Sequence, residues 1–459
     1  MKKNEKPQLL RRLYVLLCLA LLLAGAALNL PTKLCNNASG TDHLDWWSND
    51  LLIADLMYSQ NYGSDTWEIR IAFPPNIQKL TGQDNVEWVQ SEMFRNNQTF
   101  DKDFFVPYSS NLVAQRYLYK LADAVLPVSN GVLLKALYLM NALLLSLGAL
   151  LFLLYLERHT APGTALFGAA VIGVFGLLYD AMATNLYWVE WSLFAPPLVV
   201  ALLLDCRKFA DFTTEKQRLH AVFWAVFAGC TVKQLMYFEF VTSAMIAATV
   251  PAFVYLLENR RKIADWVHWY LTMIGGAVAS FVLTFGLKTA MLIADRGVEG
   301  AWSETFQNLL SRVSGLAKLL NMTDQIGNED TREATNVGVG AVLQRVGSKV
   351  ALLFNASFGI TIAQITAALL VLTVLAVVLY KLHFATGKAV LWVGAAWYAM
   401  LAPLSWFVMA KEHTWLHSTF CTISWYVPGA FVIAAAFTCC VADVVKTARE
   451  RKKVMASEV

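Results

Sequence analysis

Two aspartates stand three residues apart near the start of the segment that follows the first apolar run of the 459-residue chain. In a helix, Asp42 and Asp45 would lie on one face. Beside a low-dielectric boundary and a like charge, the pKa of one of these carboxyls is expected to rise, so that it could take a proton from a hydroxyl group near neutral pH. Both acids could instead cap the N-terminus of a helix. A general base and a helix cap both fit this spacing.

Two tryptophans follow the aspartates directly. Trp46 and Trp47 offer flat apolar faces on which a sugar ring could stack, and we expect them to contact substrate. The alternative is a belt of aromatic side chains at the membrane interface, where tryptophan is common whatever the function of the protein.

A cationic cluster lies late in the chain, at Lys411, His413 and His417. The two histidines are one helical turn apart, so one cation and two imidazoles could give hydrogen-bond donors and positive charge to a phosphate at the membrane edge. The histidine spacing is also half of a zinc site, but glutamate precedes the first histidine and no third ligand is identifiable. We expect a phosphate site, with interfacial anchoring as the alternative.

Ionisable residues at the ends of apolar runs form a third set. Glu190 leads directly into one run and Lys233 closes another. A charge in hydrocarbon costs about 3 kcal/mol and usually faces a cavity or a partner. The pattern predicts a polar pocket in which Glu190 is a further candidate for the catalytic acid and Lys233 contacts substrate. Salt bridges between helix ends are the alternative.

The composition indicates the class of protein in which these residues lie. Hydrophobic residues make up 57% of the chain and charged residues 15%, with a mean hydropathy of +0.48, whereas soluble domains are about 25% charged. Apolar runs of about 20 residues recur, which is the length of a helix that crosses a bilayer. The sequence therefore predicts an all-α polytopic membrane protein, and it contains neither a nucleotide-binding motif nor a basic stretch suited to nucleic acid.

Ten transmembrane helices are predicted, and the placement of basic residues orients them. The stretch from His220 to Leu257 is too long for one crossing. Two crossings, with a turn near Lys233, put nearly all clustered Lys and Arg on one side, as the positive-inside rule requires. Both termini are then cytoplasmic, in a multi-pass plasma membrane of bacterial type. The predicted spans are 13–31, 131–157, 161–180, 187–204, 219–235, 237–257, 268–292, 360–380, 389–409 and 422–442.

Two long segments lie outside the predicted spans, and both are expected on the extracytoplasmic face. In the first, apolar side chains recur at helical spacing over Asp42–Tyr58 and Ser109–Leu126, which predicts two amphipathic helices on the membrane surface. Arg116 lies off the apolar stripe of the second helix and is expected to contact substrate. The predicted parts are the N-terminus with the first span (1–31), the first outer loop (32–130), spans two to seven (131–292), the second outer loop (293–358), spans eight to ten (359–445) and a basic cytoplasmic tail (446–459).

This layout resembles the GT-C superfamily of integral membrane glycosyltransferases. The shared features are one span, a long acidic outer loop with two surface helices, and then a bundle of spans. The stretch Tyr108–Tyr117 is similar to the second surface helix of bacterial members, and Lys411–His417 resembles a late outer turn that carries Lys and His.

The resemblance implies transfer of a sugar from a polyprenyl-phosphate donor to an extracytoplasmic glycan, lipid or protein acceptor, with inversion of the anomeric centre. Asp42 or Asp45 would then be the base, and Lys411, His413 and His417 would hold the donor phosphate. The sequence indicates no particular cofactor, and a divalent cation such as Mg²⁺ or Mn²⁺ is optional for the reaction. The alternative function is a transporter or flippase for a lipid-linked saccharide.

Overall fold

The computed structural model describes residues 5–28, 46–63, 66–72, 89–312, 362–410 and 420–457, apart from short gaps at 177–178, 180 and 184. It also describes positions 338, 340–341, 344 and 414. The described chain is mostly helical. Its longer elements are α1 (Glu5–Leu28), α3 (Trp46–Tyr62), α5 (Val89–Arg95), α6 (Gln115–Val125), α7 (Asn130–His159), α8 (Thr164–Phe175), α9 (Ala195–Leu204), α11 (Glu215–Met236), α12 (Val241–Glu258), α13 (Ile263–Arg312), α17 (Ile362–Lys381), α18 (Gly387–Ala399), α19 (Leu401–Met409) and α21 (Phe431–Ser457).

Seven helical stretches in the described residues are long and apolar enough to cross a membrane, as the composition predicts. Three shorter apolar helices, Thr164–Phe175, Glu190–Leu204 and Thr366–Lys381, accompany them. The stretch from His220 to Leu257 falls into two helices, α11 and α12, as predicted. The turn between them falls at residues 237–240, a few residues later than expected.

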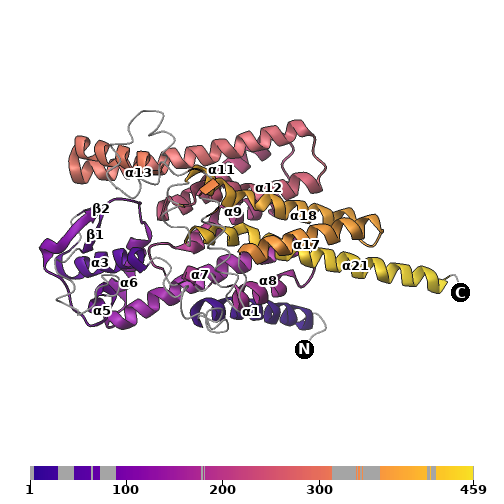
Figure 1. Ribbon diagram of the computed structural model, residues 1–459, viewed down its shortest axis with the longest axis horizontal. Coiled ribbons are helices and arrows are strands. Elements are labelled where there is room, and N and C mark those ends of the chain that lie inside the picture. Colours follow the sequence, from indigo (N-terminus) through magenta and orange to yellow (C-terminus); the bar gives the residue numbers. More distant parts are fainter. Residues whose placement is uncertain are drawn as a thin grey trace.

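The bundle has two distinct ends (Figure 1). One end carries α3, α5, α6 and a small antiparallel sheet of β1 (Ile69–Ala72) and β2 (Phe105–Tyr108), in which Ile69 pairs with Tyr108; we call it the loop end. The N-terminus and the C-terminus both lie at the opposite end, here called the terminal end.

Helix α3 is deeply buried. Every residue from Asn49 to Tyr58 is at most 3% exposed, because the helix packs against β1, α5 and α6. The prediction that this segment lies on the membrane surface by one face is therefore wrong for its described part. The helical spacing of its apolar residues was a correct signal for a helix, but that spacing says nothing about what covers the polar face.

Helix α6 does have the predicted amphipathic character. Its apolar side chains Tyr117, Leu121 and Val125 are 44 to 66% exposed, whereas Gln115 and Arg116 are buried. The helix begins at Gln115 instead of Ser109. An apolar face turned away from the protein suits a helix that lies in the membrane interface.

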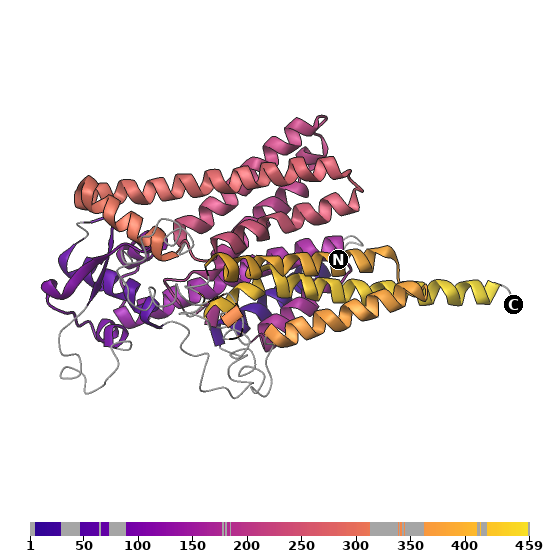
Figure 2. The same cartoon turned by 45° about the horizontal axis from the view of Figure 1, so that its top comes forward.

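Helix α13 is longer than the span predicted at 268–292 and includes the start of the predicted second loop. Its one non-helical residue, Gly297, has φ 73°, a left-handed conformation that glycine adopts without a Cβ penalty. The helix consequently runs along the edge of the bundle and turns back at the loop end (Figure 2). Most of 313–361 lies outside the described residues.

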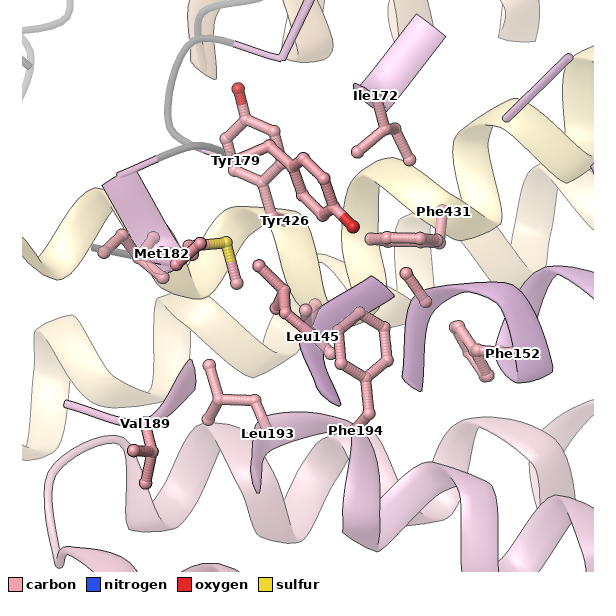
Figure 3. Packing of buried hydrophobic residues seen from close by; sticks show 14 of the residues in the cluster. Leu145, Phe152, Ile172, Tyr179, Met182, Val189, Leu193, Phe194, Tyr426 and Phe431 are labelled. Carbon is pink, nitrogen blue, oxygen red and sulfur yellow. The ribbon is translucent and has the colours of Figure 1, made fainter. Parts of the chain in front are cut away.

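Aromatic and aliphatic side chains pack together in the buried core (Figure 3). Phe194, at the start of α9, meets Phe431 of α21 edge-on at 5.2 Å between ring centroids, and Phe152 of α7 lies 6.1 Å from Phe431. A Cβ on Gly148 would lie 3.1 Å from the Phe194 ring. Three sequence-distant helices are thus joined by close aromatic packing, which favours such edge-to-face geometry.

Close backbone contact joins α1 to α8. A Cβ on Gly25 would lie 2.0 Å from the carbonyl oxygen of Gly173, and a Cβ on Gly173 would lie 2.8 Å from that of Leu21. Lipid tails are as apolar as leucine, so membrane helices associate through such small residues instead of through water exclusion.

The glycine contact can be tested by adding one methyl group. Gly25→Ala is expected to lower the melting temperature of the purified protein in detergent, because separating the two backbones costs about 1 to 3 kcal/mol. Gly286→Ala is the matched control, since a Cβ there meets no atom within 4 Å. Equal melting temperatures for the two variants would contradict the packing described for α1 and α8.

Candidate functional site

The structure describes some of the predicted site residues and not others. Glu190, Lys233 and Arg116 are described in full, and α3 begins at Trp46 and Trp47. The remaining predicted residues lie outside the described residues: Asp42, Asp45, Lys411, His413 and His417.

The described residues that follow Asp42 and Asp45 in the sequence lie beside the residues that precede Glu190. Asn49, near the start of α3, accepts a hydrogen bond on Oδ1 from the Leu186 amide at 2.9 Å, and its Nδ2 donates to Tyr138 Oη at 2.8 Å. The first turns of α3 therefore lie beside Leu186, four residues before Glu190.

The residues before the Lys411–His417 turn lie beside the connection between α11 and α12. Trp406, in α19, packs against Phe240 with 5.4 Å between ring centroids. Ser243, at the start of α12, donates to the Ala402 carbonyl at 2.8 Å. Helix α19 thus lies next to the connection between α11 and α12, which contains Glu239.

Glu190, Lys233, Tyr237 and Glu239 form what we call the buried cluster, and each of them is at most 1% exposed. Tyr237 donates its hydroxyl to Glu190 Oε2 at 2.8 Å. The other oxygen of the same carboxyl, Glu190 Oε1, is buried and has no hydrogen-bond partner among the described residues. Glu190 is therefore oriented by Tyr237 while half of its hydrogen-bonding capacity stays unused.

Lys233 organises the turn after α11. Its Nζ donates to the carbonyl oxygens of Tyr237, at 2.8 Å, and of Glu239, and it lies 3.7 Å from the centroid of the Tyr237 ring. Phe240 then adopts a left-handed φ of 58° and starts α12. The lysine that we predicted as a substrate contact binds backbone oxygens of its own turn.

The loop between β2 and α6 ties the outer segment to this cluster. Asn111 donates to Tyr187 Oη at 2.8 Å and accepts from the Phe238 amide at 2.8 Å. The amides of Val113 and Ala114 donate to the carbonyls of the last residues of α11 at 3.1 and 3.0 Å. Sequence reasoning did not single out Asn111, although it lies within the Tyr108–Tyr117 stretch on which the family resemblance rests.

Arg116 forms a buried ion pair and does not face an open site. It is 3% exposed, lies 3.1 Å from Asp55 of α3, and donates to the Trp67 carbonyl at 2.7 Å. Lys120 lies 3.2 Å from the other oxygen of Asp55. The observed partner is a carboxylate 61 positions earlier in the chain, which no local spacing signals.

Helix α13 closes the site on another side. Lys288 donates to the Ser110 carbonyl at 3.0 Å. Arg296, just before the Gly297 kink, pairs with Glu68 and with Glu304, and Glu304 also accepts from Ser109 Oγ at 2.6 Å. The kink thereby brings both parts of α13 to Arg296. This arginine binds Glu68, the residue that precedes β1.

No group of three potential metal ligands occurs in the part of the chain that the structure describes. Because Asp42 and Asp45 lie outside that part, the expectation of an optional divalent cation stays a prediction. No protein-family model matches the chain, and no curated protein or solved structure matches it either.

The Asp55–Arg116 pair yields a prediction about stability. Asp55→Asn is expected to lower the free energy of unfolding by about 3 to 5 kcal/mol, because it leaves a buried guanidinium without its counter-charge. The double variant Asp55→Asn/Arg116→Met should lose clearly less than the sum of the single variants. Thermal unfolding of the purified protein measures both.

Glu450→Gln is the control for this comparison, since its pairing with Lys446 is long, at 4.0 Å, and both side chains are more than 60% exposed. An exposed pair of this kind contributes about 0.3 kcal/mol. Additive losses in the double variant would mean that Asp55 and Arg116 do not stabilise each other.

Proposed function

We propose that the chain is an integral membrane glycosyltransferase that transfers a sugar from a polyprenyl-phosphate donor to an extracytoplasmic glycan, lipid or protein acceptor. The observation that carries the proposal is the carboxyl group of Glu190, which is fully buried and has one oxygen without a hydrogen-bond partner among the described residues. A buried polar atom left unpaired costs free energy, and ionisable groups held at such a cost are typical of functional sites.

The surroundings of Glu190 give further support. The described residues beside the Asp42–Asp45 segment contact the chain at Leu186, and those before the Lys411–His417 turn contact Phe240. Leu186 precedes Glu190 by four residues, and Phe240 directly follows Glu239 of the buried cluster. The proposal is that the carboxylates and cations of the two segments meet beside this cluster, as a two-substrate site requires.

The chemistry needs few groups. A base takes the proton of the acceptor hydroxyl, whose oxygen then attacks the anomeric carbon of the donor. The bond from that carbon to the phosphate oxygen breaks, and polyprenyl phosphate leaves with the bonding electrons. Alignment and stabilisation of the leaving charge supply most of the catalysis. We assign the base to Asp42, Asp45 or Glu190, and the hold on the phosphate to Lys411, His413 and His417.

We further propose ten membrane crossings with both termini in the cytoplasm and the loop end outside. The seven long apolar helices and the three shorter ones fall at the ten predicted positions. The termini share one end of the bundle (Figure 1), and the basic C-terminal tail lies there, as the positive-inside rule favours for a cytoplasmic end.

A flippase for a lipid-linked saccharide is the second candidate, and one observation favours it. Between α8 and α9 the described backbone is irregular, with short 3₁₀ segments at Ala181–Ala183 and Glu190–Phe194. Interrupted helices with buried charged groups are typical of transporter binding sites. A transport role would use the same cluster without bond cleavage.

Activity measurements separate the two candidates. Purified protein is incubated with a panel of radiolabelled polyprenyl-phosphate hexoses and with lipid-linked glycan as acceptor. Either Glu190→Gln or Asp42→Asn/Asp45→Asn, whichever removes the base, is expected to lower kcat about 10²- to 10⁴-fold, the range for a lost general base. Asp101→Asn, an exposed acid of the same outer segment, is the control and should retain the activity.

Full transfer activity in both acid variants would contradict the proposed site. The glycosyltransferase proposal fails if the wild-type protein transfers none of the hexoses. The second candidate then gains support if the protein, reconstituted in vesicles, moves the labelled lipid across the bilayer.

A further inference from the structure

A groove opens between α11 and α13 at the terminal end of the molecule, with a volume of about 590 Å³. Its lining includes Lys216, Leu219, His220 and Phe223 from α11 and Thr272 from α13. The four α11 residues recur at three- and four-residue spacing, so they form one stripe along the helix. The groove thus has a polar entrance near Lys216 and an apolar floor at Phe223.

Among the described residues that line the groove there is no carboxylate, so none of them neutralises the positive charge of Lys216 there. The neighbouring acid, Glu215, is occupied elsewhere: it accepts a hydrogen bond from Trp269 Nε1 at 2.6 Å and lies 3.5 Å from Arg261. The groove is therefore complementary to an anion.

His220 adds a hydrogen-bond donor. Trp224 donates its indole N–H to His220 Nε2 at 3.1 Å, and an indole nitrogen can only donate. Nε2 is consequently the acceptor, and in the neutral ring the proton lies on Nδ1. This N–H is left to donate to a ligand oxygen.

The surface beside the groove is apolar. Trp224, Leu271 and Ile274 are 49 to 62% exposed on α11 and α13, within helices that are long and apolar enough to cross a membrane. A ligand in the groove would thus touch charged and polar groups at one end and membrane hydrocarbon at the other. Only an amphiphile satisfies both surroundings.

We propose that this groove binds an anionic glycerophospholipid. Its phosphate would lie between Lys216 and His220 Nδ1, and an acyl chain would follow Leu219 and Phe223 toward the bilayer. Basic pockets between membrane helices are known to hold anionic head groups in this way. The proposal is independent of the glycosyltransferase assignment, since α11 rises 1.5 Å per residue and Lys216 lies about 25 Å along this helix from Lys233 of the buried cluster.

Native mass spectrometry of the full-length protein in detergent tests the charge requirement. Dioleoyl phosphatidylglycerol is expected to be retained in preference to dioleoyl phosphatidylcholine, and Lys216→Gln should weaken its retention about fivefold, the factor that one basic residue near an anionic lipid contributes. Lys208→Gln makes the same change of charge on α10 (Arg207–Ala210), outside the groove lining, and should leave retention unchanged. Inorganic phosphate at the lipid concentration should not displace the lipid.

Filling the groove tests its shape. Thr272→Trp is expected to abolish preferential retention of the anionic lipid, whereas Leu271→Trp, at the adjacent exposed position, should preserve it. Equal losses in Lys216→Gln and Lys208→Gln, equal retention of the two lipids, or unchanged binding in Thr272→Trp would each overturn the proposal. Displacement of the lipid by phosphate alone would also overturn it, because the apolar floor would then have no role.

Discussion

A cation removed from water must find acceptors, and the loop end of this molecule is assembled around that requirement. Lys233, Lys288 and Arg116 are all at most 5% exposed. Each of them reaches oxygens outside its own helix: the carbonyls of the α11–α12 turn, the carbonyl of Ser110, and the carboxylate of Asp55. Breaking such a pair by removing one partner is strongly unfavourable, so these contacts hold the outer segment and the bundle in one arrangement.

That arrangement explains how Glu190 can be held in a costly position. The carboxyl lies on a short 3₁₀ segment that precedes α9, where the backbone alone would not orient it. Tyr237 fixes one oxygen, Lys233 fixes the turn that carries Tyr237, and Asn111 links this turn to the outer segment. A side chain held through three successive contacts keeps its geometry without using its second oxygen, which is the condition for a group that must accept a proton or a ligand.

Hydropathy predicted most of the fold, because a bilayer demands long apolar helices wherever the chain crosses it. The two helices within His220–Leu257 and the outward apolar face of α6 followed from length, charge and periodicity. The burial of α3 did not, since it depends on what other segments place over its polar face.

The candidate site was predictable only in part for the same reason. The free-energy cost of placing a charged group in hydrocarbon marked Glu190 and Lys233 as unusual. Lys233, however, binds carbonyl oxygens of the α11–α12 turn, and Arg116 binds Asp55, 61 positions earlier in the chain. No local sequence pattern predicts either partner. The kink at Gly297 was likewise not predicted, because a single glycine in an apolar helix is common.

The two ends of the bundle handle charge in opposite ways, and this contrast bears on function. At the loop end, buried cations bind carbonyls and carboxylates from several segments. At the terminal end, Lys216 is exposed in a groove with an apolar floor and no acid. Paired charges fix a structure, whereas an unpaired charge beside hydrocarbon attracts a mobile amphiphile. The proposed transfer reaction would therefore use the loop end, where side chains are held by several contacts. The proposed lipid site would use the terminal end, where the ligand itself would complete the electrostatic balance.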